Sequence, residues 1–333
     1  MNKVIQIKLI FEREKMRTIS IVIPCYNSQD TIGPVVDEIV SVIDGKLHYE
    51  IILVNDGSTA SLWDVIRSLV DKYPNRIKGI RFAKNFGQHS ALMAGYRATK
   101  GDIVVQMDDD GQSNPMGIFT LLSKIDEGYD AVFARYPDAK KSHFRSLGSE
   151  FNRRMCISLI NMPSDLHPMS FAAYRRFVID EMIKYDKPYP YVGGLTFRTT
   201  SNLCDVEIEH RSRAQGESNY SLKKLIKLWM NGFTAFSVKP LEIAAVSGVF
   251  VALAGIIYAM FIIIRRITGF QYLEGWSTLV ALTLLLDGFM LIMIGLVGEY
   301  IGRVYICLNN APQYVIRDEY GNTDIKGIVS NDL

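Results

Sequence analysis

The sequence is poor in cysteine and has no cysteine pair at the spacing of a metal site or a disulfide framework. Its four cysteines are scattered, at Cys25, Cys156, Cys204 and Cys307. This pattern excludes a zinc ribbon and a disulfide-stapled secreted domain, and it indicates reduced thiols in a cytosolic compartment. An excess of one charge sign is also lacking, because the formal net charge is only +2. We therefore expect no nucleic-acid partner.

Two short nucleotide-binding motifs are absent as well. No Gly-x-x-x-x-Gly-Lys-Ser/Thr occurs, and no Gly-x-Gly-x-x-Gly follows a predicted strand. These absences disfavour a P-loop NTPase and a nicotinamide-dependent enzyme. A secretory signal is not expected either, because lysines, arginines and glutamates interrupt residues 1–17. We interpret that stretch as an N-terminal extension.

Charged residues are nearly missing from two long runs toward the C-terminal end. The run Ile243–Ile264 carries no charge, and at about 1.5 Å per residue it can cross the roughly 30 Å hydrocarbon layer of a bilayer. A second run, Trp276–Gly298, is interrupted only by Asp287. We predict transmembrane helices over residues 241–264 and 276–298, joined as a hairpin by a short loop.

Basic residues flank this predicted hairpin more than they occupy its loop. The loop carries Arg265 and Arg266, whereas the flanks carry Lys223, Lys224, Lys227, Lys239, Arg303 and Arg317. Because positive loops stay inside, we expect both flanks to be cytoplasmic. The sequence thus predicts a multi-pass protein of the cytoplasmic (inner) membrane. Its soluble domain (residues 18–220), its tail (299–333) and both termini are expected in the cytoplasm.

Two features beside the hairpin are open to two interpretations each. Residues 221–240 place Leu222, Leu225 and Trp229 at helical spacing with lysines on other faces. This pattern is typical of an amphipathic helix in the headgroup layer, or of a helix packed on the soluble domain. Asp287 is costly inside a bilayer unless it is paired or faces protein. It therefore indicates either a functional role or a helix–helix contact in an oligomer.

The first two-thirds of the chain alternates between predicted strands and predicted helices. The strands are expected at Ser20–Pro24, Glu50–Asn55, Ile77–Phe82, Ile103–Met107 and Ala131–Ala134, and the helices at Thr31–Ile43, Leu62–Tyr73, Ser90–Thr99 and Pro115–Glu127. Such alternation predicts an α/β fold with a parallel sheet covered by helices on both faces. Ligands of such folds bind beyond the carboxyl ends of the strands.

Polar turn residues follow four consecutive predicted strands. They occur in the segments PCYN, NDGS, KNFGQ and DDDGQ. Side chains alternate along an extended strand, so Asp108 and Asp110 can share a face while Asp109 points away. Two carboxylates with the amide oxygen of Gln112 are hard oxygen ligands that suit Mg²⁺ or Mn²⁺. A solvated acidic turn is the alternative interpretation.

Six motifs in a fixed order carry a family resemblance. IVIPCYN, ILVNDGS, KNFGQHSALMAGY, DDDGQ, RAQGESNYS and GLVGEYIGR follow one another between about Thr18 and Tyr314. In this order they resemble family 2 glycosyltransferases that charge polyprenyl phosphates, such as dolichol-phosphate mannose synthase and bacterial undecaprenyl-phosphate sugar transferases. The resemblance implies a glycosyltransferase A-type, nucleotide-sugar-binding domain with a mostly parallel sheet. An amphipathic interface helix and two transmembrane helices would follow this domain.

The resemblance also implies roles for individual residues. Donor-binding residues would be Pro24, Tyr26, Asn27, Asp56, Lys84, Asp108 and Gln112. The metal would be held by Asp108 and Asp110, and the catalytic group would comprise Asp165, Asp110 and Arg213. The acceptor phosphate would meet Arg135, Arg145, Ser149 and Ser218. The chain departs from the family pattern at Ser28, at Ser113-Asn114 and at His167–Met169, beside Asp165.

The implied reaction is inverting, metal-dependent transfer of one hexose from a UDP-sugar to undecaprenyl phosphate. A phosphate acceptor with a second pKa of about 6 is already ionised at pH 7. Asp165 would then position the reactants, whereas an alcohol acceptor would need it as a base. The alternatives are a GDP-mannose-dependent mannosyltransferase and an inactive membrane scaffold that binds nucleotide sugars. A processive synthase is disfavoured, because no Gln-x-x-Arg-Trp motif occurs. Partners would be the membrane and a homo-oligomer, for which a tetramer is one arrangement.

Overall fold

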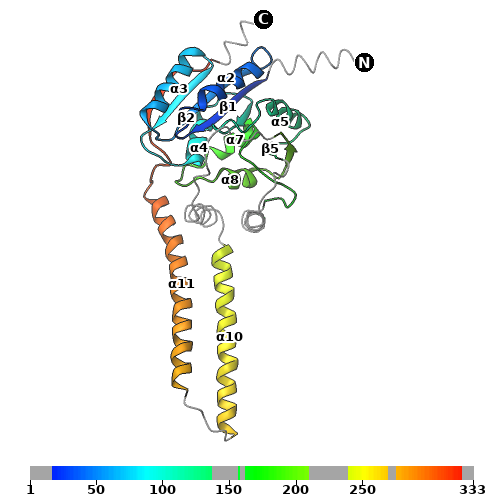
Figure 1. Cartoon of the computed structure of the whole chain (residues 1–333). Coiled ribbons are helices and arrows are strands. Elements are labelled where there is room, and N and C mark those ends of the chain that lie inside the picture. Colours follow the sequence, from blue (N-terminus) through cyan, green and yellow to red (C-terminus); the bar gives the residue numbers. More distant parts are fainter. Residues whose placement is uncertain (1–16, 137–156, 158–161, 210–238, 269–274, 325–333) are drawn as a thin grey trace, which may run out of the picture. The chain divides into compact units, whose positions relative to one another are not determined.

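A computed structural model describes residues 17–136, 157, 162–209, 239–268 and 275–324 (Figure 1). The chain divides into two compact units, one formed by Met1–Ser221 with Pro312–Leu333 and the other by Leu222–Ala311. The predicted interface helix at 221–240 lies almost entirely outside the described residues. So does the N-terminal extension apart from its last residue.

The first unit is built on one eight-stranded sheet with the order β7-β5-β6-β4-β1-β2-β3-β8. The strands are β1 (Thr18–Cys25), β2 (His48–Asn55), β3 (Ile77–Phe82), β4 (Ile103–Gln106), β5 (Ala131–Arg135), β6 (Ala172–Arg175), β7 (Leu203–Glu207) and β8 (Ile316–Tyr320). The four central strands β4, β1, β2 and β3 are parallel to one another. A mostly parallel α/β sheet is therefore confirmed.

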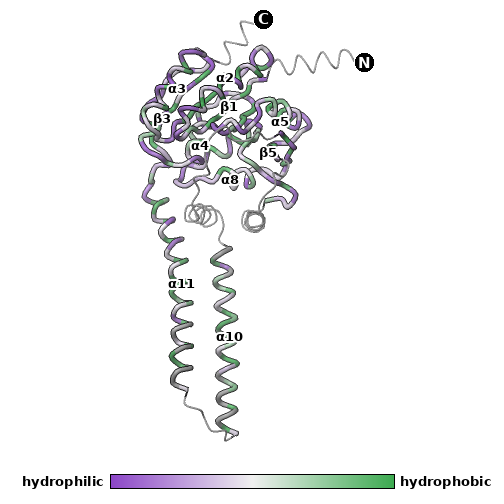
Figure 2. The backbone as a smooth tube through the Cα atoms, in the orientation of Figure 1, coloured by the Kyte–Doolittle hydropathy of each residue, from purple (hydrophilic) through white to green (hydrophobic). Residues whose placement is uncertain are grey.

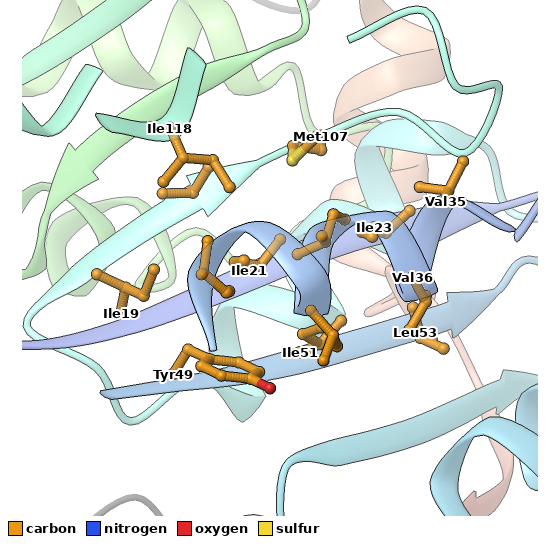
Figure 3. Packing of buried hydrophobic residues seen from close by; sticks show 14 of the residues in the cluster. Ile19, Ile21, Ile23, Val35, Val36, Tyr49, Ile51, Leu53, Met107 and Ile118 are labelled. Carbon is orange, nitrogen blue, oxygen red and sulfur yellow. The ribbon is translucent and has the colours of Figure 1, made fainter. Parts of the chain in front are cut away.

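Helices cover both faces of the sheet, as the alternation of elements predicts. They are α2 (Ile32–Ile43), α3 (Ala60–Lys72), α4 (Gln88–Ala98), α5 (Gly117–Asp126), α7 (Arg176–Met182) and α8 (Val192–Thr199). Ile21 and Ile23 of β1 pack with α2, α3 and α5 in one buried cluster, part of which appears in Figure 3. Val22 points to the opposite face, where a Cβ on Gly95 of α4 would lie 2.3 Å from its Cγ1. Strand alternation thus divides the core into two layers.

The sheet differs from the predicted series of parallel strands by two antiparallel strands, β6 inside the sheet and β8 at one edge. β6 lies between β4 and β5 and runs antiparallel to both. β8 runs antiparallel to β3. Neither strand was predicted, because each is short and its sequence carries no clear alternation. β6 matters for the site, because the segment that leads into it passes the end of β4.

The C-terminal tail is part of the first unit rather than a separate extension. A buried carboxylate on β2, Glu50, holds its far end. Glu50 accepts hydrogen bonds from the Ser20 hydroxyl and the Lys100 amide, both at 2.6 Å, and from the Thr323 hydroxyl. Glu50 is 0% exposed. A charge this deeply buried needs such donors, so the tail helps to satisfy the core.

In its described residues, the second unit contains two helices, α10 (Lys239–Ile267) and α11 (Trp276–Leu308). Hydrophobic residues recur along both (Figure 2). Among the described residues, Leu286–Leu308 is the one helical stretch long and apolar enough to cross a membrane, and Ala244–Tyr258 is a shorter apolar stretch. Helices therefore occur at both predicted positions, but two membrane crossings are not confirmed. Asp287 is exposed on α11.

Replacing Glu50 tests the role of the buried carboxylate. Glu50→Ala leaves the Ser20, Lys100 and Thr323 donors unpaired, so we expect the free energy of unfolding of the domain to fall by about 2–4 kcal/mol. Chemical denaturation of the detergent-solubilised protein measures it. Glu127→Ala is the control, because its ion pair with Lys124 is exposed and is worth about 0–1 kcal/mol. Equal losses in the two variants would contradict this role.

Candidate active site

The carboxyl ends of β4, β1, β2 and β3 lie next to one another, so the loops that follow them share one edge of the sheet. These loops carry the four polar segments that the sequence singles out. Side-chain and backbone hydrogen bonds connect them across the edge. This is the position at which α/β folds of this kind bind ligands.

Asp56, directly after β2, organises the loop between β3 and α4. Its carboxylate accepts hydrogen bonds from the Phe86 amide at 2.7 Å, the Gly87 amide at 2.9 Å and the Asn85 side chain at 3.0 Å. Asp56 is 3% exposed. Burial raises the pKa of this carboxyl, and the two backbone amides oppose the rise. Asp56 therefore fixes the shape of the neighbouring loop from inside the fold.

The next residue, Gly57, permits this close contact between loops. It has a φ of +66°, and a Cβ there would lie 2.2 Å from the backbone carbon of Lys84. The loop after β1 also contacts the loop after β2, because the Asn27 backbone amide donates a hydrogen bond to the Ser58 hydroxyl at 3.0 Å. Asn27 itself adopts a left-handed φ of 54°. The sequence NDGS thus does more than form a turn, since its glycine and serine connect three strand ends.

Asp109 joins the loop after β4 to the loop after β1. Its carboxylate accepts the Tyr26 amide at 3.0 Å, and its carbonyl accepts the Thr31 hydroxyl at 2.7 Å. Burial raises the pKa of Asp109. The side chain of Tyr26 is 55% exposed. Asp109 therefore holds a loop that presents an aromatic ring to solvent.

Asp108 has different partners from Asp109. Its carboxylate accepts hydrogen bonds from the side-chain amide of Gln88 at 3.1 Å and from the hydroxyl of Ser170, a residue just before β6. Burial, followed by the nearby charges of Asp110 and Asp109, raises its pKa to about 6. Asp110 accepts the backbone amide of Gln112 at 3.1 Å. The run of three aspartates thus concentrates negative charge at one strand end.

These residues fit a divalent cation in their chemistry. Burial, followed by the neighbouring charges of Asp110 and Asp109, raises the pKa of Asp108, and hard oxygen donors of this type suit Mg²⁺ or Mn²⁺. Within the described ranges, no group of three or more His, Cys, Asp and Glu side chains is placed to hold a metal ion. A cation here would therefore complete its coordination with oxygens from elsewhere, such as a diphosphate or the Gln112 amide.

The remaining predicted residues are placed as follows. Pro24 is buried in β1, and Lys84 is exposed with its ammonium 5.2 Å from the Phe86 ring centroid. Asp165 is exposed, and its carbonyl lies 3.2 Å from the His167 ring. Arg135, at the end of β5, is 3.6 Å from the Glu207 carboxylate. Arg145, Ser149, Arg213 and Ser218 lie outside the described residues.

Two residues that contact Asp108 were not predicted as site residues. Gln88 opens α4 inside the KNFGQ segment, so its place after a predicted strand was an available signal. Ser170 had no such signal, because the antiparallel strand β6 that brings it to β4 was not predicted. The segment from Asp165 to Ser170 therefore reaches the aspartate run at its last residue, through the contact of Ser170 with Asp108.

Sequence comparisons identify the family. Residues 20–183 match Glycosyl transferase family 2, and residues 239–304 match the GtrB C-terminal hairpin. Uncharacterized glycosyltransferase YkcC from Bacillus subtilis (strain 168) is 33% identical over 91% of this chain and 94% of that protein. The chain belongs to glycosyl transferase family 2. This glycosyltransferase is also 31% identical to the Undecaprenyl-phosphate 4-deoxy-4-formamido-L-arabinose transferase of Proteus mirabilis (strain HI4320), over 92% of its own chain and 95% of that relative.

The glycosyltransferase also shares its fold with a solved structure. Glucosyl-3-phosphoglycerate synthase from Mycobacterium tuberculosis, in complex with Mn²⁺ and UDP-glucose, aligns with a TM-score of 0.51 and 21% identity. The alignment covers 68% of this chain and 80% of that chain. At this identity the similarity concerns the fold alone, and it confirms the expected A-type α/β architecture.

The raised pKa of Asp108 predicts a pH-dependent stability of the metal-free glycosyltransferase. A folded-state pKa of about 6, against 3.8, stabilises the fold below about pH 4, and this contribution is lost as the pH rises through 6. Asn cannot ionise, so Asp108→Asn does not lose this stability as the pH rises. We therefore expect the variant to be more stable than wild type by about 2 kcal/mol at pH 7.5. Near pH 4 the two proteins should be equally stable.

Denaturation in EDTA at both pH values measures this difference. The control is Asp64→Asn, because Asp64 is exposed on α3 and should change stability at neither pH. An Asp108→Asn protein that is less stable than wild type at pH 7.5 would contradict the prediction that the ionised Asp108 carboxylate destabilises the fold.

Proposed function

We propose that this enzyme transfers a single sugar, a hexose in the first instance, from a UDP-sugar to undecaprenyl (polyprenyl) phosphate, with inversion at the anomeric carbon. The observation that carries the proposal is the aspartate run at the end of β4, beside the loops that Asp56 organises. The match of residues 239–304 to the GtrB C-terminal hairpin supports a lipid acceptor. So does the printed name of the 31% identical relative.

The nucleoside would lie over the loops after β1, β2 and β3. The exposed ring of Tyr26 offers a stacking surface, and Asn27 offers polar groups beside it. Pro24 and Asp56 shape this surface from below, because both are buried. Lys84 is exposed on the third loop and would face the negative charge of the donor.

The diphosphate would lie against Asp108, Asp110 and Gln112, which would hold Mg²⁺ or Mn²⁺. A divalent cation at this place would neutralise the charge that develops on the leaving diphosphate. The similar fold crystallised with Mn²⁺ and UDP-glucose supports this cofactor. Gln88 and Ser170 would fix the orientation of the Asp108 carboxylate. Arg213, as a second cation, is proposed from the family motif alone.

In the proposed reaction, an oxygen of the acceptor phosphate attacks the anomeric carbon. The bond from that carbon to the diphosphate oxygen breaks, and its electron pair leaves with UDP. A phosphate monoester with a second pKa of about 6 is largely ionised at neutral pH, so no proton has to be removed. Asp165, exposed on the segment that leads to Ser170, is thus assigned a positioning role. Arg135, with Arg145, Ser149 and Ser218, would receive the acceptor phosphate.

Membrane attachment would bring the lipid to this site. α10 and α11 would form the hairpin in the cytoplasmic membrane, with the catalytic domain and both termini in the cytoplasm. Pro312–Leu333 belongs to the same compact unit as the catalytic domain, which supports a hairpin whose two flanks are on one side of the membrane. The enzyme would act as a homo-oligomer, for which a tetramer is one arrangement.

A second candidate donor carries 4-deoxy-4-formamido-L-arabinose, a sugar named in relatives that are 31% and 33% identical. GDP-mannose is a third donor to be tested. An inactive scaffold is disfavoured, because the Asp108 and Asp110 carboxylates are both present.

The experiment uses the full chain in lipid nanodiscs with polyprenyl phosphate, Mn²⁺ and each of these donors, and it identifies the lipid product by its mass. We expect one sugar per lipid phosphate from a UDP-linked donor, and no product in EDTA. Absence of a lipid product with every donor would overturn the proposal in favour of the scaffold.

Asp110→Asn tests the metal assignment in the same assay. Loss of one carboxylate ligand should lower the rate of lipid-linked sugar formation at least about 100-fold, because charge on the leaving group is no longer neutralised. Asp64→Asn, an exposed change on α3, should leave the rate unchanged. A rate for Asp110→Asn equal to that of wild type would refute the assignment.

A further inference from the structure

A short segment after α11 lies against the end of β3, next to the loop between β3 and α4. We call Gln313–Ile316 the C-terminal strap. The Ala83 amide donates to the Val315 carbonyl at 2.9 Å, and Phe82 pairs with Ile316 in the sheet. Lys84 and Asn85 follow directly in the chain. The strap therefore borders the loop whose amides surround Asp56.

A row of three aromatic rings connects the strap to that loop. The Tyr314 ring stacks on Phe82, with centroids 5.0 Å apart and an interplanar angle of 8°. Phe82 in turn meets Phe86 edge-on, with centroids 5.7 Å apart and an angle of 88°. The Phe86 amide donates the 2.7 Å hydrogen bond to Asp56. Such ring geometries are favourable beyond simple burial, and Phe82 thereby links Tyr314 of the strap to Phe86.

Arg97 on α4 fixes the strap from the other side. Its guanidinium donates to the Gln313 side chain at 2.7 Å and to the Tyr314 hydroxyl at 3.0 Å. The same guanidinium donates to the Ile183 and Tyr185 carbonyls at 3.2 and 2.8 Å. Gln313 is 7% exposed. These charge-assisted bonds are strong and directional, so Tyr314 has a defined position.

We propose that the C-terminal strap is a positioning element of the donor site, and that Tyr314 holds the Phe86 and Gly87 amides in place around Asp56. The inference rests on the proposed nucleotide-sugar function of that site. It assigns the segment that follows α11 a role in donor affinity in addition to its part in the sheet. Tyr314 does not touch substrate in this account and acts through Phe82 and Phe86.

The tail provides a matched control in Tyr320. Tyr314 and Tyr320 are both half-buried, and both lie in the chain after α11, although Tyr320 is outside the strap. Tyr320 instead faces α3, where its hydroxyl donates to Asp71 at 2.9 Å and the Arg67 guanidinium lies 5.0 Å from its ring centroid. A general loosening of the tail would follow from changing either residue, whereas the positioning role belongs to Tyr314 alone.

The test compares Tyr314→Leu, Tyr314→Phe and Tyr320→Leu in the full chain. We expect Tyr314→Leu to raise the donor KM roughly threefold to tenfold, with kcat changed less than twofold. Tyr314→Phe keeps the aromatic ring and should retain most of the donor affinity of the wild-type protein. Tyr320→Leu should leave KM within twofold of wild type. Equal KM values for Tyr314→Leu and Tyr320→Leu would overturn the proposal.

Hydrogen exchange of the metal-free, ligand-free protein separates this inference from the proposed function. We expect Tyr314→Leu to exchange the Phe86 and Gly87 amides at least about threefold faster than wild type, and Tyr320→Leu to leave them unchanged. Unchanged protection in Tyr314→Leu would overturn the strap even where the enzyme transfers sugar. Faster exchange would support it even where no donor is accepted, and it remains measurable if the variant loses thermal stability.

Discussion

The arrangement of the strand ends depends on one buried carboxylate. Asp56 is almost fully buried and accepts three N–H donors from the loop between β3 and α4. An unpaired carboxylate at this depth would be strongly unfavourable, so the loop must stay close to β2. Gly57 makes that approach sterically possible. The surface over which a nucleoside would lie is therefore determined from inside the fold.

The three aspartates after β4 form a second constraint, because they accumulate negative charge, whereas the carboxylate of Asp56 is balanced by N–H donors. The loop after β4 carries Asp108, Asp109 and Asp110, and Asp109 holds the loop after β1. Asp108 keeps an elevated pKa although Ser170 and Gln88 donate to it. Burial and, after it, the neighbouring like charges disfavour the ionised form of Asp108, and a bound cation would offset that cost. In the proposed reaction, a bound cation would make use of this charge.

Much of this arrangement was predictable from the sequence, and the remainder was hidden for physical reasons. β1 to β4 are apolar strands followed by turn residues, so their parallel order and the shared edge could be predicted. The contacts of Ser170 and Tyr314 could not, because they come through the short antiparallel strands β6 and β8. Asp56 was expected to contact the nucleoside, but three hydrogen bonds to one loop give it a structural role that a local pattern does not reveal. The second membrane crossing is unconfirmed, because α10 has a shorter apolar stretch than α11 among the described residues.

The central claim is that the aspartate run and the nucleotide belong to one site. Binding of Mn²⁺, followed by the electron paramagnetic resonance signal of the free ion, tests it with and without UDP or GDP. We expect weak Mn²⁺ uptake by the protein alone and stronger uptake with one of the two nucleotides, UDP in the first instance. This gain should be absent in Asp110→Asn. Mn²⁺ uptake that neither nucleotide changes, or an equal gain in Asp110→Asn, would contradict the account.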